Sequence, residues 1–169
     1  MNMNISEALQ NVNLLVIRAL DGLAEKEWDI PGVCGDWSIK DIVAHLASYE
    51  HLIVDVLTTF QGGELTPTVE RWTNSRATFN AEEVEARKYA TAQQVMDEYQ
   101  GMQVEATSFI MQIPPEKVQQ TGTMPWYGNQ HSLADFIQRM IEHIREHVAQ
   151  ISAFHVQVNR EMEGDTSAT

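Results

Sequence analysis

Residues 132–154 read SLADFIQRMIEHIREHVAQISAF, and their apolar side chains recur at spacings of three and four. This spacing predicts one face of a long amphipathic α-helix. Ser132, followed three residues later by Asp135, forms a capping box that marks where the helix begins. The apolar stripe consists of Leu133, Phe136, Ile137, Met140, Ile141, Ile144, Val148, Ile151 and Phe154. Such a face has to be covered by other elements of the fold.

Three further stretches show the same helical periodicity, and no stretch alternates as a strand would. One of them opens with its own capping box, from Ser38 to Asp41, and another ends at the two prolines of residues 114–115. The sequence therefore predicts an all-α protein, a four-helix bundle. We expect its helices at about residues 4–23, 38–58, 91–113 and from 132 onward, with long connections over residues 60–78 and 116–131 and a short polar helix from about residue 80.

The length of 169 residues is enough for one domain and too little for two of ordinary size. We expect the bundle domain over residues 1–160, followed by a polar, disordered tail over residues 161–169. The single cysteine, Cys34, excludes an intramolecular disulfide and fits a reducing compartment. Because residues 1–10 lack the basic and apolar segments of a signal peptide, we expect a cytoplasmic location.

The charge balance excludes two classes of partner. Asp and Glu number 24 against 11 Lys and Arg, which gives a formal net charge of -13. A nucleic-acid-binding protein needs a basic patch to displace counterions from phosphates, and an anionic membrane surface makes the same demand. No stretch approaches the roughly 20 apolar residues of a membrane span. We therefore expect no nucleic-acid partner and no membrane partner.

His143 and His147 lie one turn apart on the predicted last helix, at the edge of its apolar stripe. Residues four apart on a helix have Cβ atoms about 6 Å apart on the same side. Two imidazoles so placed can bind one cation, and the edge of the stripe borders the interior in which helix bundles build metal sites. The pair alone has low specificity, because six histidines in a chain of this length often produce such a spacing by chance.

A third ligand has to come from another helix, and His45 at the border of the second apolar arc is the best candidate. Three neutral nitrogens leave a tetrahedral cation one open position, as in reactive sites. The alternative is that His45 is a buried, hydrogen-bonded core residue. The histidines further from this pattern have ordinary explanations: His51 lies on the polar side of its helix, and His155 is too far from His147 to share one ion.

Other catalytic patterns are weaker. Cys34 has no basic neighbour in the sequence that would activate a thiol nucleophile. No phosphate-binding loop or dinucleotide fingerprint is present, because the glycines of residues 32–35 belong to a turn. The histidines therefore remain the best candidates for chemistry.

Two segments resemble the signature motifs of the DinB-like superfamily of bacterial four-helix proteins. Residues 37–46, WSIKDIVAHL, resemble the motif of its second helix, and residues 142–151, EHIREHVAQI, resemble that of its last helix. Trp126 and Asn129, ahead of the final helix, fit the same layout. The resemblance covers about residues 28–151, most of the chain.

The resemblance implies a divalent metal, Zn²⁺ or Ni²⁺, bound by His45, His143 and His147. Related mycothiol-dependent maleylpyruvate isomerases and bacterial thiol S-transferases use the metal to activate a low-molecular-weight thiol, which a metal holds as its thiolate. Those isomerases typically have a glutamate among the ligands, whereas this chain offers only histidine, so their substrate is not carried over. Members of the superfamily are often homodimers.

We therefore expect a metal-dependent enzyme that activates a low-molecular-weight thiol for group transfer, or water for hydrolysis, and acts on a small-molecule substrate. One alternative is a non-catalytic small-molecule-binding or stress-protection module on the same bundle, and another is a helical dimerisation domain. The residues expected to line the rim of the site and bind substrate are Trp37, Tyr127, Asn129 and His131, with Asp36 beside Trp37. None of them is assigned a role in proton transfer.

Overall fold

The computed structural model describes residues 4–166, and every named element in that range is helical. The prediction of an all-α protein is confirmed. Four of the helices are long and coincide with the four periodic stretches of the sequence. The elements are α1 (Ile5–Leu20), a 3₁₀ turn (Glu25–Glu27), α2 (Ile39–Thr59), α3 (Pro67–Asn74), α4 (Arg76–Ala86), α5 (Ala92–Ile110), α6 (Pro115–Gln119) and α7 (Leu133–Thr166).

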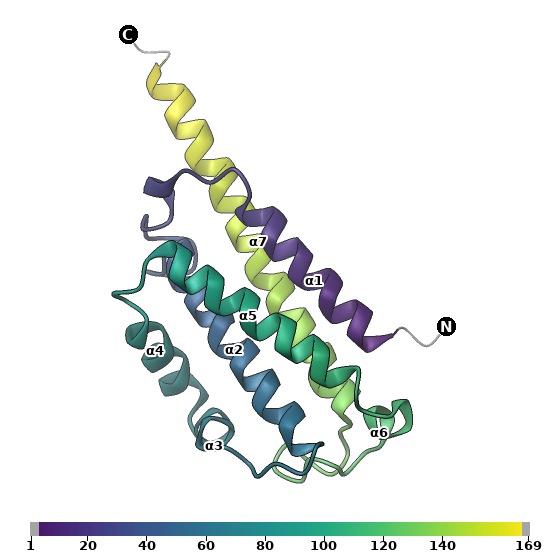
Figure 1. Ribbon diagram of the computed structural model, residues 1–169. Coiled ribbons are helices and arrows are strands. Elements are labelled where there is room, and N and C mark those ends of the chain that lie inside the picture. Colours follow the sequence, from purple (N-terminus) through teal and green to yellow (C-terminus); the bar gives the residue numbers. More distant parts are fainter. Residues whose placement is uncertain (1–3, 167–169) are drawn as a thin grey trace.

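The long helices pack together as a bundle (Figure 1). Helix α2 lies along α5 and α1 lies along α7, while smaller contacts join α1 to α5 and α2 to α7. Large apolar side chains such as Leu9, Leu46, Phe136 and Ile141 are almost completely buried between them. Removing this apolar surface from water, at roughly 25 cal/mol per Å², is the main source of stability. Helices α3 and α4 lie on the outside, beside α2 (Figure 1).

Capping boxes fix the starts of the two helices that carry the candidate ligands. The Ser38 hydroxyl accepts a hydrogen bond from the Asp41 backbone N–H at 3.2 Å, and the Asp41 carboxylate accepts one from the Ser38 N–H at 2.9 Å. Ser132 and Asp135 form the same pair of bonds at 3.2 and 2.8 Å. A cap of this kind stabilises a helix by about 1 kcal/mol. Both capping boxes confirm the starts predicted for these helices.

The first long connection contains more helix than the sequence predicts. Residues 60–78 were expected to be irregular, but α3 lies within them and α4 begins at Arg76. Helix α3 has Pro67 in its first turn, where the missing N–H of a proline costs nothing. Only Val69 and Trp72 are buried on α3. Two apolar positions are too few to establish a helical period, which explains why the sequence pattern missed this helix.

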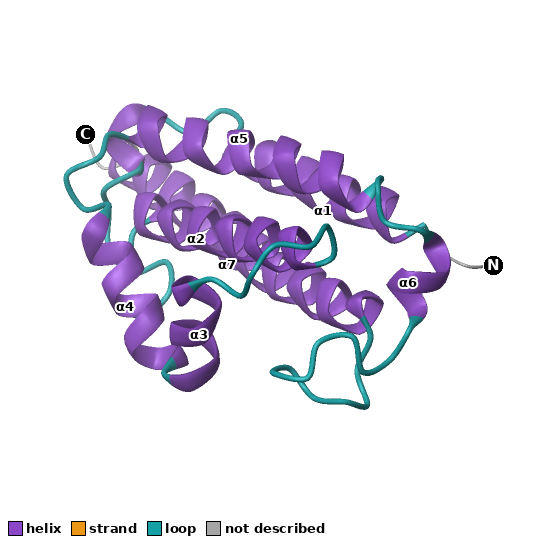
Figure 2. Cartoon of the chain, turned by 60° about the horizontal axis from the view of Figure 1, so that its bottom comes forward, coloured by secondary structure: helices purple, strands orange, loops and turns teal. Residues whose placement is uncertain are grey.

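Two further differences concern the second long connection and the C-terminal segment. The connection over residues 116–131 includes most of the short helix α6 and continues as a long loop at that end of the bundle (Figure 2). Helix α7 continues to Thr166, so the predicted tail over residues 161–169 begins as helix. Residues 167–169 of that predicted tail lie outside the described residues.

Helix α1 carries apolar side chains on its outer face. Leu14, Leu15 and Ile17 are exposed there. These side chains are exposed because the contacts of α1 with α7 and α5 cover only its inner sides. Within the described part of the chain, no helix combines the length and the apolar character that crossing a membrane requires.

Candidate metal centre

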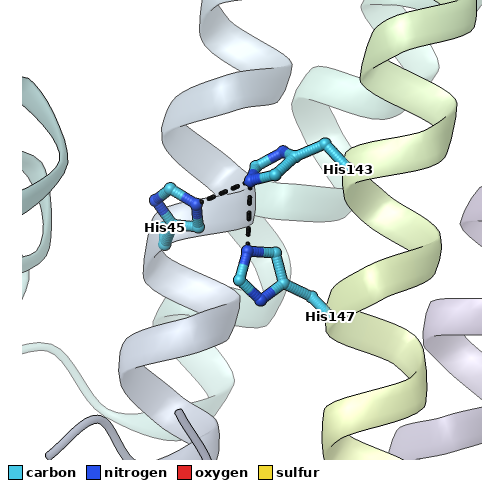
Figure 3. Close-up of side chains that lie close together, drawn as sticks. All are labelled: His45, His143 and His147. Carbon is cyan, nitrogen blue, oxygen red and sulfur yellow. Dashed lines mark hydrogen bonds between the residues drawn. The ribbon is translucent and has the colours of Figure 1, made fainter. Parts of the chain in front are cut away.

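Three histidines from two helices converge inside the bundle (Figure 3). His45 projects from α2, and His143 and His147 project from one side of α7. The Nε2 atom of His143 lies 3.0 Å from that of His45 and 3.1 Å from that of His147. The three candidate ligand atoms lie within 4.8 Å of one another. The fold thus brings together the same three histidines that the sequence analysis selected from six.

The spacing of the three Nε2 atoms fits a single metal ion. Ligands placed tetrahedrally at about 2.0–2.1 Å from Zn²⁺ lie roughly 3.3 Å from one another. The two shortest Nε2 separations here, 3.0 and 3.1 Å, are within a few tenths of an ångström of that value. Imidazole nitrogen is also a ligand that suits divalent zinc and nickel. The residues present therefore fit a divalent metal in donor type and in spacing.

Burial keeps the three imidazoles neutral. Desolvation, followed by the charges of the neighbouring His143 and His147, lowers the pKa of His45 to about 2. Burial and then the charge of His147 lower the pKa of His143 to about 4, and burial also lowers the pKa of His147. A neutral imidazole has the lone pair that binds a metal, whereas an imidazolium does not. At neutral pH the cluster can therefore bind a cation without first losing protons.

One of the three candidate ligands is oriented by a second hydrogen bond. The Nδ1 atom of His147 lies 2.8 Å from the Oε1 atom of Gln150, three residues further along α7. Because an amide oxygen only accepts, Nδ1 carries the proton and Nε2 keeps its lone pair toward the other histidines. The Nδ1 atoms of His45 and His143 are buried without a hydrogen-bond partner among the described residues. Gln150 was not singled out from the sequence, although its position three residues after His147 was visible there.

Aromatic rings enclose the cluster on the α2 side. The Trp37 ring, which the sequence analysis expected at the rim, packs against His45 with a centroid separation of 5.0 Å. Tyr49 lies closer still, with ring centroids 4.7 Å from His45 and 4.3 Å from His143. Tyr49 was missed in the sequence analysis. Its spacing of four from His45 on α2 is the signal that could have identified it, because residues at that spacing share a helix face.

The hydroxyl of Tyr49 ties the outer helices to the cluster. It donates a hydrogen bond to Oδ1 of Asn80 on α4 at 3.1 Å and accepts one from Nε1 of Trp72 on α3 at 3.3 Å. Trp72 and Tyr49 are both buried. The α3–α4 pair is therefore anchored directly to the residue that lines the histidine cluster.

The other residues predicted at the rim lie near Trp72. The Tyr127 ring stacks on Trp72 with a centroid separation of 6.2 Å, and the His131 ring lies 5.2 Å from Tyr127. Asn129 is exposed in the same loop. Tyr127 and His131 are therefore connected to the cluster through two further side chains: Trp72, which bonds the Tyr49 hydroxyl, and Tyr49, whose ring contacts His143.

The remaining candidates from the sequence have local explanations. His51 lies 2.9 Å from the Glu98 carboxylate and is partly exposed, in keeping with the polar position predicted for it. His155 lies two turns beyond His147 on α7. Cys34 is half-buried in the turn before α2, where its carbonyl accepts a hydrogen bond from the Trp37 N–H at 3.1 Å.

Comparison with protein families gives one match that covers most of the chain. The family described as the DinB superfamily matches residues 9–151, a range that includes all three histidines of the cluster. Searches of curated proteins and of solved structures find no match.

Proposed function

Since the chain belongs to the DinB superfamily, we propose that it is a divalent-metal-dependent enzyme whose ion is held by His45, His143 and His147. The convergence of three Nε2 atoms from two helices is the observation that carries this proposal. Burying three imidazoles side by side costs desolvation and leaves two Nδ1 atoms without partners. A shared cation offsets that cost by using the lone pairs that face one another.

The proposed ion is Zn²⁺ or Ni²⁺, for which imidazole is a suitable ligand. When bound, it supplies a Lewis acid with one position left by the three histidines, where a thiol is held as thiolate or the pKa of a water is lowered toward 7. The single cysteine of the chain lies in the turn before α2. A low-molecular-weight thiol is therefore the proposed source of sulfur. In the transfer, the thiol proton passes to solvent, the sulfur forms a bond to an electrophilic carbon, and the bond from that carbon to the leaving group breaks, so that the leaving group departs with the bonding electron pair.

The side chains around the cluster have proposed roles in binding and orientation. Gln150 holds the proton on Nδ1 of His147, and Trp37 and Tyr49 restrict the access of water to the imidazoles. Tyr127, with Asn129 and His131 in the same loop, is proposed to contact the small-molecule substrate together with Trp37. Support comes from the contact of Tyr127 with Trp72, whose indole reaches the hydroxyl of Tyr49.

Metal analysis of chain purified without an affinity tag tests the metal site. We expect about one ion per chain, and loss of that ion in His45→Ala and in His147→Ala. His155→Ala is the matched control, because it removes an imidazole from the same helix two turns beyond the cluster. If the wild-type protein contains no metal and both cluster variants fold, the proposal is contradicted. His45 is then a buried, hydrogen-bonded core residue.

Turnover separates the enzyme from its alternative, a non-catalytic small-molecule-binding or stress-protection module. The metal-loaded chain is incubated with bacillithiol, mycothiol or glutathione and an electrophile, and product is counted per chain. Repeated product formation that is lost in His45→Ala supports the enzyme. Stoichiometric binding of a small molecule without product supports the module.

We further propose that the chain acts in the cytoplasm as a homodimer. The single cysteine fits a reducing compartment. The exposed side chains of Leu14, Leu15 and Ile17 supply an apolar strip on α1 that a second copy would cover. Sedimentation of the wild type and of Leu14→Glu tests the dimer, and a monomeric wild type contradicts it.

A further inference from the structure

Two arginines beside the histidine cluster have no acidic partner among the described residues. Arg76 is the first residue of α4, and Arg139 lies one turn before His143 on α7. Both are exposed, and neither forms an ion pair within residues 4–161, whereas Arg71 and Arg87 each pair with two glutamates. Seven of the 11 basic residues form no ion pair among the described residues, so it is the position of these two arginines, and not the missing partner, that distinguishes them.

Arg76 lies over the ring of Trp72, close to the histidine cluster. Its guanidinium carbon lies 4.3 Å from the centroid of the Trp72 ring, a cation–π contact. The Nε1 atom of Trp72 donates to the Tyr49 hydroxyl at 3.3 Å, and the Tyr49 ring lies 4.3 Å from that of His143. Two aromatic side chains thus connect the guanidinium to one of the proposed ligands.

Arg139 approaches the same region from the other side. It precedes His143 by four residues, which places the two Cβ atoms about 6 Å apart on one side of α7. Phe136, three residues before Arg139 on α7, packs against Trp72 with a ring-centroid separation of 6.0 Å, so α7 near Arg139 lies beside the indole that Arg76 covers. The charges of Arg76 and Arg139 both oppose the rise that burial causes in the pKa of Tyr127, whose ring stacks on the same indole. Both cations therefore lie near Trp72, between α4, α7 and the loop that carries Tyr127.

Two acidic residues lie near Arg139 on α7. Asp135, four residues before it, is occupied in the capping box with Ser132. Glu142, three residues after it, accepts a hydrogen bond from the side-chain amide of Gln138 at 3.1 Å. Neither carboxylate forms an ion pair with Arg139 in the part of the chain that the structure describes.

We propose that Arg76 and Arg139 form an oxyanion-binding subsite, so that the small molecule bound at the histidine cluster carries a carboxylate or phosphate group directed toward α4. A guanidinium presents a planar fork of donors that matches either group, and both side chains are open to a ligand. The position of the reacting atom at the histidines rests on the proposed function. The arginine pair itself does not depend on a metal.

An NMR titration of the metal-free chain tests the subsite directly. The arginine Nε–Hε signals are followed as succinate, inorganic phosphate or the neutral succinamide is added. We expect one or both anions to shift Arg76 and Arg139 but not Arg145, which the helical repeat turns away from Arg139, and succinamide to shift none of them. The anion that binds more tightly identifies the class of oxyanion. No shift with either anion, or an equal shift at Arg145, overturns the proposal.

A second measurement links the subsite to the metal centre. The cobalt(II)-loaded chain is titrated with 3-mercaptopropionate and with the neutral 3-mercaptopropanol, using the sulfur-to-cobalt absorption band. We expect the anionic thiol to bind roughly tenfold more tightly, as charge-assisted hydrogen bonds provide. This preference is expected to shrink in Arg76→Gln and in Arg139→Gln and to persist in Arg145→Gln. The affinity for 3-mercaptopropanol is expected to stay the same in all three.

The outcomes distinguish the two proposals. Equal affinity of the wild type for both thiols overturns the arginine subsite and leaves the metal site standing. Failure to bind cobalt(II) overturns the proposed function, and the titration with succinate and phosphate then still decides whether the arginines bind an oxyanion.

Discussion

Gln150 holds His147 through a hydrogen bond of 2.8 Å between the imidazole Nδ1 and the amide Oε1. Both residues belong to α7 and are separated by less than one turn, so this contact forms as soon as the helix does. It fixes the tautomer in which Nε2 is directed at the other two histidines. The local sequence of α7 therefore orients one ligand before any tertiary contact with α2 is made.

Replacing Gln150 with leucine is predicted to weaken metal binding 10- to 100-fold, the range found when a partner outside the ligand shell is lost. The reason is that Nδ1 of His147 loses its acceptor and the imidazole is free to rotate. Competition with a chromogenic chelator measures the affinity. Gln157→Leu on the same helix is the control, and Gln150→Glu, which keeps an acceptor, should restore binding. An unchanged affinity in Gln150→Leu contradicts the role given to this contact.

Replacing Tyr49 with phenylalanine is predicted to destabilise the fold by about 1–3 kcal/mol, because Trp72 Nε1 loses its acceptor inside the protein. The ring that contacts His45 and His143 is kept, so metal affinity should change little. Urea unfolding and chelator competition separate the two effects. A large loss of metal affinity with unchanged stability would show that the hydroxyl acts at the metal and not as an anchor for α3 and α4.

A second buried polar group lies elsewhere in the bundle and has a predictable pH dependence. Burial raises the pKa of Glu50 on α2 to about 8 from an ordinary value of 4.5. Neither carboxyl oxygen has a hydrogen-bond partner among the described residues. Nearby, the buried hydroxyl of Tyr99 donates to Asn13 on α1, a residue whose amide also acts on Glu50. At neutral pH the folded protein therefore keeps this carboxyl protonated.

The unfolded chain ionises at Glu50 from about pH 4.5, whereas the folded chain does so only near pH 8. The folded state thus binds more protons between these values, and stability is predicted to fall as the pH rises through this window. Glu50→Gln should remove this slope and raise stability at pH 7 by on the order of 3 kcal/mol, with little change at pH 4. Urea unfolding from pH 4 to 8.5 measures the free energy of unfolding at each pH, and Glu64→Gln, at an exposed position, is the control. Identical pH slopes for Glu50→Gln and wild type contradict the prediction.

Arg87 is predicted to matter more for stability than Arg71, although each pairs with two glutamates. The Arg87 side chain is only 14% exposed and bonds both Glu83 and Glu98, whereas that of Arg71 is 45% exposed. Arg87→Ala removes the shared partner of two partly buried carboxylates, which leaves Glu83 only Arg71 and Glu98 only His51, and should cost about 1–3 kcal/mol. Arg71→Ala removes ion pairs of a more exposed side chain and should cost under about 1 kcal/mol. The difference is measured by urea unfolding, and equal losses would show that burial does not set the strength of these pairs.

The long helices could be predicted from the sequence because each repeats its apolar spacing over several turns and two of them open with a capping box. Helix α7 shows this most clearly, since its stripe and the box from Ser132 to Asp135 agree. Helices α3 and α6 could not, because each is short and buries only one or two apolar residues. Their position is set by tertiary contacts, such as the hydrogen bond from Trp72 to Tyr49, that leave no periodic signal.

The candidate ligands were accessible to sequence reasoning for a similar reason. The spacing of His143 and His147 is a local property of one helix, and His45 follows a motif that resembles a family signature. The residues around them were harder to predict. Tyr49 and Trp72 meet only because α3 folds back on α2, and no spacing in the sequence encodes that approach.

The most direct test of the central claim is an anomalous difference map from a crystal of the zinc-loaded chain, recorded at the zinc edge. The account predicts one strong peak bonded to Nε2 of His45, His143 and His147 at about 2.0–2.1 Å. A map with no peak between these three nitrogens, or with the zinc bound elsewhere, would contradict it.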